Sequence, residues 1–187
     1  EDAGEMAAAL GMNFVPGIEV SCRHEGISIH LLAYWPDPSN DEIVAMLGRT
    51  RDARIERAQE IVRRVGADYP VTWEDVPHYA PDVLDAVRTF RATGAVTVFA
   101  HPGADGRGKV VPTSVIELMA AAGLVGLEVE HRDHNEPQRD RLARIAQRLG
   151  LVHTGASDYH GMGKLNRLGE NVTSDAALQQ LQDARGH

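Results

Sequence analysis

Two polar side chains, Asp158 and His160, follow a short apolar segment at 151–154. Gly155 and Gly161 bound the turn that holds them, which indicates that the backbone bends there or approaches another group closely. In an extended segment, side chains two residues apart point to the same face. A carboxylate and an imidazole on one face, at the end of a strand, predict half of a metal site. The alternative is a polar turn with a solvated Asp and His.

Three further residues with metal-binding side chains belong to other apolar segments. Glu19 lies near the end of one segment, His30 lies inside the next, and His101 directly follows a third. In α/β folds, ligand-binding groups collect at the carboxyl ends of parallel strands. Imidazole and carboxylate groups suit Zn, Mn or Fe. Together with Asp158 and His160, these residues predict a hydrolytic centre with a metal-activated water as the attacking group.

Each of these residues has a simpler interpretation when it is taken alone. Glu19 could cap a turn, and His101 before Pro102 could simply end a strand. His30, in a strand, is more often a hydrogen-bonded core histidine than a ligand. The coincidence of all five residues favours the metal centre.

The elements that must position these residues alternate between strands and helices. Strands are predicted at 14–20, 26–34, 95–100, 124–131 and 151–154. Helices are predicted at 1–10, 39–65, 82–93, 112–122, 136–149 and 174–181. Short connections between strands and helices in the second half are typical of right-handed βα units, and hence of an α/β fold with a parallel sheet or barrel.

The length and charge of the chain limit its class and its partners. The 187 residues suffice for one domain with a sizeable core, and we expect a single domain over 1–187. The formal net charge of -8 argues against binding of long nucleic acid, but it allows a small phosphorylated substrate if a metal supplies positive charge locally. Cys22 is the single cysteine, which fits a cytoplasmic protein, and no apolar run reaches the length of a membrane span.

Five short motifs occur in order along the chain. They are Pro-Gly-Ile-Glu at 16–19, His-Leu-Leu-Ala-Tyr at 30–34, Ala-His-Pro-Gly at 100–103, Gly-Leu-Glu-Val-Glu-His at 126–131 and Ser-Asp-Tyr-His-Gly at 157–161. Together they resemble the polymerase-and-histidinol-phosphatase (PHP) family of metal-dependent phosphoesterases. The resemblance covers about 17–169, and the subgroup it indicates contains stand-alone bacterial nucleotide phosphatases and short-RNA exonucleases.

The resemblance implies a distorted (β/α)7 barrel that holds two or three divalent ions, with Mn, Zn or Fe as candidates. It implies these metal ligands: Glu19, His30, His101, Asp158 and His160. It also places Glu130 and His134 near the substrate. Lys164 is a candidate phosphate contact on its charge alone, with a solvated surface lysine as the alternative.

The implied activity is hydrolysis of a small phosphomonoester, such as a nucleoside monophosphate or 3',5'-bisphosphate, or of short oligoribonucleotide ends. One alternative is a histidinol-phosphate-type phosphatase on the same scaffold. The other is a degenerate PHP module without catalytic activity.

The sequence departs from the family's pattern in two places. The family opens with a strand bearing His-X-His, followed by an Asp and then by a second strand bearing Asp-His, and this series of motifs does not occur ahead of Glu19 in the sequence. Relatives also carry a small helical insertion where Val76 and Pro77 adjoin here. Five strands are too few to close such a barrel. We therefore expect a domain that is incomplete before Glu1 and between Val76 and Pro77.

Overall fold

The computed structural model of the 187-residue chain describes residues 2–65, 80–163 and 165–186. Its helices are α1 (Asp2–Ala9), α2 (Asp41–Val65), α3 (Val83–Ala92), α4 (Thr113–Ala122), α5 (Glu136–Leu149) and α6 (Asp175–Asp183). Its strands are β1 (Gly17–His24), β2 (Ile27–Tyr34), β3 (Val96–Phe99), β4 (Gly126–Glu130) and β5 (Val152–Gly155). Short 3-10 turns lie at η2 (Asp105–Arg107) and η3 (Gly161–Gly163).

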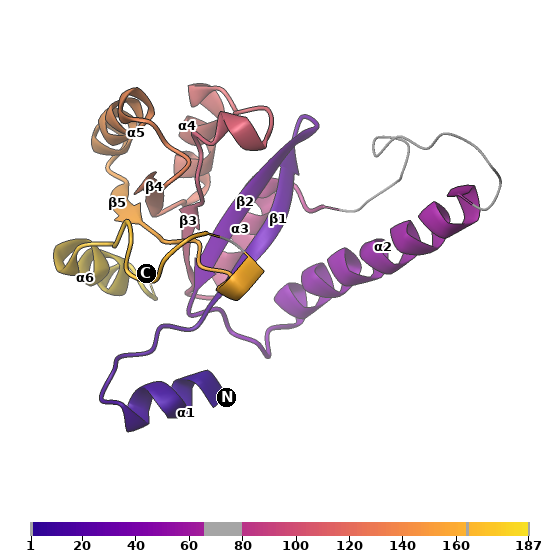
Figure 1. Ribbon diagram of the computed structural model, residues 1–187, viewed down its shortest axis with the longest axis horizontal. Coiled ribbons are helices and arrows are strands. Elements are labelled where there is room, and N and C mark those ends of the chain that lie inside the picture. Colours follow the sequence, from indigo (N-terminus) through magenta and orange to yellow (C-terminus); the bar gives the residue numbers. More distant parts are fainter. Residues whose placement is uncertain (1, 66–79, 164, 187) are drawn as a thin grey trace.

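The strands form one mixed sheet in the order β1-β2-β3-β4-β5 (Figure 1). β1 and β2 make an antiparallel hairpin, and β2 also pairs antiparallel with β3. The hairpin closes through Glu25 and Gly26, whose φ angles of 47° and 81° match the two-residue turn that suits the strand twist. β3, β4 and β5 are parallel, as the alternation of strands and helices predicts.

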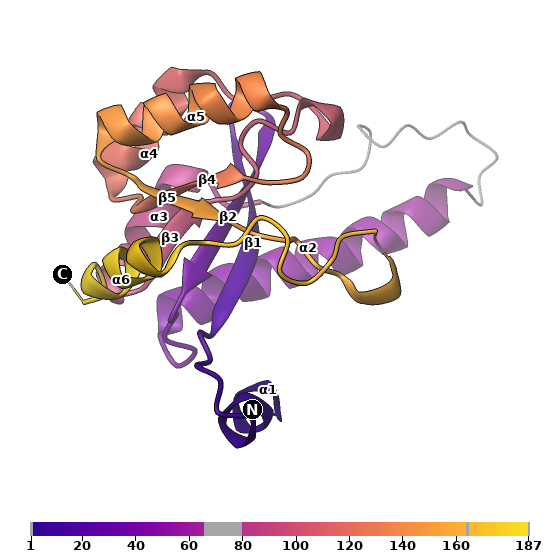
Figure 2. The same ribbon diagram turned by 60° about the vertical axis from the view of Figure 1, so that its left-hand side comes forward.

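The two faces of this sheet are covered by different helices. Leu127 and Val129 of β4 belong to the larger core, together with buried residues of α3, α4 and α5. On the other face, Val98 packs in a smaller cluster with Leu181 of α6. Figure 2 shows α4 and α5 on one side of β4 and β5, and α6 on the other. Because side chains alternate along a strand, Glu128 projects to the α6 face.

Local sequence signals explain where the helices begin and end. Asp82 caps α3 by accepting bonds from the N–H groups of Leu84 and Asp85. α5 begins with a reciprocal capping box between Asn135 and Gln138. α5 ends at Gly150, whose left-handed φ of 66° allows the chain to turn directly into β5.

The predicted elements agree with the structure in type and, within a few residues, in position. The predicted barrel is not confirmed, because the described strands form an open sheet with β1 and β5 at its edges. The junction of Val76 and Pro77, where we expect missing residues, lies outside the described residues. Among the described helices, none has the length and apolar character needed to cross a bilayer.

Candidate metal centre

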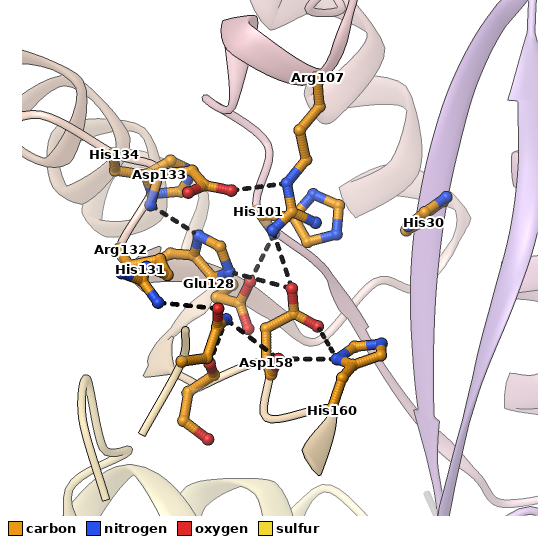
Figure 3. Close-up of polar contacts among 12 residues, drawn as sticks. His30, His101, Arg107, Glu128, His131, Arg132, Asp133, His134, Asp158 and His160 are labelled. Atoms are coloured by element: carbon orange, nitrogen blue, oxygen red, sulfur yellow. Dashed lines mark hydrogen bonds and ion pairs between the residues drawn. The ribbon is translucent and has the colours of Figure 1, made fainter. Parts of the chain in front are cut away.

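The candidate metal centre lies on the α6 face of the sheet, where the parallel strands end (Figure 3). His101, His131 and Asp158 follow the carboxyl ends of β3, β4 and β5, the position at which open α/β sheets bind ligands. The hairpin brings Glu19 and His30 to the same region from within β1 and β2.

Glu19, His30 and His101 form a compact group of ligand atoms. Glu19 Oε1 lies 2.5 Å from His30 Nδ1 and 3.7 Å from His101 Nε2. One ligand atom from each residue lies within 4.8 Å of the other two. The hairpin register makes Glu19 and His30 diagonal neighbours, since Ser21 pairs directly with His30. Pairing of β2 with β3 then places His101 beside them, and the Ala100 N–H donates to the His30 carbonyl at 3.0 Å.

The donor atoms of this group fit a divalent cation. Two ligand atoms bonded to one ion at about 2.1 Å lie at most about 4.2 Å apart, which accommodates the distance between Glu19 and His101. Among the residues that the structure describes, the buried atoms His30 Nδ1 and His101 Nε2 have no hydrogen-bond partner of acceptable geometry. A buried polar atom without a partner costs free energy, and a bound cation would give both nitrogens a partner. The imidazoles of His101 and His30 also hold the pKa of the Glu19 carboxyl far below its usual range, so it is ionised.

Asp158 lies next to this group and is held by Arg107. Arg107 Nη2 donates to Asp158 Oδ2 at 2.8 Å, and its Nε donates to Asp133 Oδ2 at 2.6 Å. Burial disfavours the charged form of the guanidinium and so lowers the pKa of Arg107. The two bonds to carboxylates outweigh the effect of burial, and the pKa lies above its ordinary value. His131 links the two groups, since its Nε2 lies 3.9 Å from Asp158 Oδ2 and its ring centroid lies 5.4 Å from that of His101.

The turn after β5 differs from the extended geometry that the spacing of Asp158 and His160 predicts. Asp158 has a left-handed φ of 47°, and His101 a φ of 34°; strain of this kind at non-glycine residues concentrates at functional sites. His160, about half exposed, lies with Nδ1 2.7 Å from the Asp158 carbonyl oxygen and 3.2 Å from Asp158 Oδ1. Because a carbonyl only accepts, Nδ1 carries the hydrogen and Nε2 is the basic nitrogen, the form in which histidine binds metals.

His131 is a fully buried imidazole with a defined tautomer. Its Nδ1 accepts the Asp133 N–H at 3.1 Å, so the hydrogen resides on Nε2, which is buried and has no hydrogen-bond partner within residues 2–65, 80–163 and 165–186. Burial lowers the pKa of His131 to about 4, and the charges of His101 and Arg107 act in the same direction. The ring is therefore neutral near pH 7, with one N–H directed at Asp158.

Glu128 is a buried carboxyl at the back of the site. Its Oε2 accepts the His101 N–H at 2.6 Å, which fixes the backbone of a predicted ligand. Burial raises the pKa of Glu128 to about 8, against the effect of that N–H, and the charges of Asp158 and Glu19 add to the rise.

His134, predicted near the substrate, is bound on both ring nitrogens by backbone groups. Its Nδ1 lies 2.8 Å from the Val129 carbonyl oxygen, and its Nε2 accepts the Gly103 N–H at 3.1 Å. Burial lowers its pKa, although the bond to the Val129 carbonyl opposes the shift. This geometry favours positioning of the loop after His101 over direct contact with a substrate.

Glu130, also predicted near the substrate, belongs to a separate group of charges. Its carboxylate pairs with Arg139 at 3.3 Å and with His153 at 3.3 Å. An irregularity in the register of β4 and β5 lies between Glu128 and Glu130, so the two carboxyls do not continue one regular face. Lys164 lies outside the described residues.

Sequence reasoning missed Arg107, Glu128, His131 and Asp133 as members of the site. The signal for Glu128 was present, since it is a charged residue between two apolar residues in a strand with parallel neighbours on both sides. Arg107 and Asp133 lie in loops, where no periodicity indicates the direction of a side chain.

Comparison with solved structures identifies a close structural relative. The chain has a TM-score of 0.89 and 30% identity to a Bifidobacterium adolescentis protein assigned as a metal-dependent phosphoesterase. The match covers 100% of this chain and 82% of that protein. No family model matches the chain.

Two named enzymes are similar to this chain in amino-acid sequence. A 3',5'-nucleoside bisphosphate phosphatase of Chromobacterium violaceum is 26% identical over 211 residues, which cover 89% of this chain and 74% of the relative. A phosphoribosyl 1,2-cyclic phosphate 1,2-diphosphodiesterase of Eggerthella lenta is 29% identical over 219 residues, which cover 91% and 82%. Both alignments are longer than the 187-residue chain, so these relatives contain internal segments that it lacks.

The fold, the cluster of ligand atoms and the extent of these matches define a metal-dependent phosphoesterase, an enzyme that hydrolyses phosphoric esters. The five short motifs between residues 16 and 161 occur in the order found in one group of metal-dependent phosphoesterases, the PHP family. The chain belongs to the PHP family.

Proposed function

We propose that this enzyme hydrolyses nucleoside monophosphates or 3',5'-bisphosphates, or the ends of short oligoribonucleotides. The observation that carries the proposal is the convergence of Glu19, His30 and His101 beside Asp158 and Arg107. The nucleotide class is supported by the two relatives, which are named for nucleoside and phosphoribosyl phosphates.

Two or three divalent ions, Mn, Zn or Fe, complete the proposed centre. Glu19, His30 and His101 would hold one ion, and Asp158 and His160 would contribute to another. When bound, such ions supply Lewis-acid activation of water and neutralise phosphoryl oxygens. The distorted barrel remains part of the proposal, as does substrate contact by Glu130 and Lys164.

The chain's own donors would orient the phosphoryl group. His131 offers a neutral Nε2–H that has no hydrogen-bond partner in the described part of the chain and lies 3.9 Å from Asp158 Oδ2. Arg107 supplies a fixed positive charge on the same side. A phosphoryl oxygen that enters between them would accept from both, and such preorganised donors stabilise charge that develops in the transition state.

A cavity of about 140 Å³ opens beside these groups and is suited to a second anionic group. Its lining includes His30, His101, Arg107 and Lys109. Two cations next to the predicted metal ligands favour a substrate with two phosphates over one with a single phosphate.

The proposed activity is tested by phosphate release from a nucleoside 3',5'-bisphosphate, a nucleoside 5'-monophosphate and histidinol phosphate, each with Mn²⁺, Zn²⁺ or Fe²⁺. We expect turnover of the nucleotides that needs an ion and that falls at least about 100-fold in His101→Ala and Asp158→Ala, because each removes a ligand. His24→Ala is the matched control, since His24 pairs with Asp82 away from the site.

Faster turnover of histidinol phosphate would establish the alternative phosphatase. No phosphate release with any of the three ions would favour the noncatalytic module.

Lys109 provides a test of the cavity. Lys109→Ala should raise KM for the 3',5'-bisphosphate about tenfold while KM for the 5'-monophosphate changes little, because one charge contact with the second phosphate is lost. Arg88→Ala on α3 is the matched control, since Arg88 pairs with Asp85 on the surface. Equal changes for both substrates in Lys109→Ala would contradict the assignment of the cavity.

A further inference from the structure

Asp158 needs external support for its backbone conformation. Its φ of 47° lies in the left-handed region, which non-glycine residues adopt only uncommonly. That conformation is coupled to the direction of its carboxylate, which meets Arg107 and faces His131.

Asn166 provides this support from a distant part of the chain. Asn166 is buried, and its Nδ2 donates to the carbonyl oxygens of Ser157 at 2.8 Å and of Asp158 at 3.0 Å. One amide group thus holds two consecutive carbonyls in the same direction. A single side chain therefore fixes the peptide planes on both sides of the Asp158 Cα atom.

The orientation of the Asn166 amide is fixed by its partners. Arg132 Nη1 donates to Asn166 Oδ1 at 2.8 Å, and a guanidinium can only donate. The two carbonyls on the other side can only accept, so the reversed amide would lose all three bonds. Arg132 also lies 3.6 Å from the Glu170 carboxylate, which completes the network.

This network connects the two loops that form the second half of the site. Arg132 directly follows His131 after β4. Asn166 donates hydrogen bonds to the turn that carries Asp158 after β5. The bond between Arg132 and Asn166 therefore sets the position of Asp158 relative to His131.

We propose that Asn166, oriented by Arg132, is a positioning residue that holds the Asp158 carboxylate in place for a divalent cation. This inference rests on the proposed function, because it takes Asp158 as a ligand. Its consequence is that a side chain outside the predicted ligand set controls the affinity of part of the metal centre.

The test is a calorimetric titration of the metal-free full chain with Mn²⁺, together with thermal unfolding of the same samples. Asn166→Ala and Asn166→Asp should both weaken binding at one site at least about tenfold and leave the remaining binding near the wild-type value. Asn166→Asp keeps the shape and the contact with Arg132 but turns an acceptor toward two carbonyls. It therefore separates loss of the donor from loss of packing.

Asn135→Ala is the matched control, because it removes an asparagine that caps α5 and does not contact the site. This variant should lose thermal stability and keep the affinity for Mn²⁺. Arg132→Gln should weaken Mn²⁺ binding less than Asn166→Ala does. Mn²⁺ binding by the Asn166 variants that equals the wild-type binding would overturn the inference.

A wild-type chain that takes up no Mn²⁺ would instead remove support from the proposed function. The crystal structure of Asn166→Ala then decides the positioning role separately. Asp158 should leave the left-handed region in that structure, and an unchanged φ would refute the role.

Discussion

The pKa values of Glu128 and His131, two buried residues of the site, are shifted in opposite directions. Burial raises the pKa of Glu128 from 4.5 to about 8 and lowers that of His131 from 6.5 to about 4. Both shifts favour the neutral form, since a buried charge without a partner is costly. Without a metal, the interior of this site is therefore less charged at pH 7 than its composition indicates.

The pH dependence of stability follows from these shifts. The folded chain keeps a proton on Glu128 between pH 4.5 and about 8 that the unfolded chain releases. The contribution of Glu128 is thus fully present below pH 4.5 and is lost as the pH rises toward about 8, at up to about 1.4 kcal/mol per pH unit. His131 acts in the opposite direction between pH 4 and 6.5, where rising pH stabilises the folded chain.

Glu128→Gln isolates the contribution of the carboxyl, because the amide can still accept the His101 N–H. Chemical denaturation of the metal-free protein at pH 6.5 and pH 8 should show that the wild type loses more stability than the variant over this interval. An equal loss in both proteins would contradict the raised pKa of Glu128.

Sequence reasoning selected residues by two properties: a ligand-type side chain and a place in or directly after an apolar strand. It still missed Glu128 and His131, which have both properties. Glu19, His30 and His101 meet both conditions, and the structure brings them together. Glu130 meets them too, but the register irregularity after Glu128 takes it to Arg139 and His153. Such an irregularity has no signature in a single sequence, because both geometries accept the same residues.

At the scale of elements, the end of β5 is closely packed against two other segments of the chain. A Cβ atom on Gly155 would lie 2.4 Å from the carbonyl oxygen of Asn171 and 2.8 Å from the Cβ of Glu130. Thr173 bonds to both backbone groups of Gly155, accepting its N–H at 3.0 Å and donating to its carbonyl at 2.7 Å. The segment at 171–173 is therefore fastened to β5 directly before the turn that carries Asp158.

Gly155→Ala should destabilise the protein by about 1–3 kcal/mol, because the contact with main-chain atoms cannot relax without displacing the 171–173 segment. Urea denaturation measures the change. Gly48→Ala within α2 is the matched control, since a Cβ atom there meets open space and should stabilise the helix by about 0.5–1 kcal/mol. A Gly155→Ala protein as stable as the wild type would contradict the packing at this position.

For the whole molecule, the alternation of strands and helices was sufficient to predict the class and the parallel half of the sheet. Caps such as Asn135 and stops such as Gly150 are local signals, so the element boundaries were predictable within a few residues. The partner of each strand was not predictable, because the pairing of the β1–β2 hairpin with β3 depends on tertiary packing across a long stretch of sequence.

The junction of β2 and β3 consists of only four residue pairs, from Leu31 with Phe99 to Tyr34 with Val96. Elements joined by few pairs open locally at a lower free energy than the whole molecule. A cation shared by Glu19, His30 and His101 would span this junction, and its binding free energy would add to the cost of opening. Removal of the ion would therefore divide one cooperative unit into two, and the hairpin would be the first part to exchange its amide hydrogens with solvent.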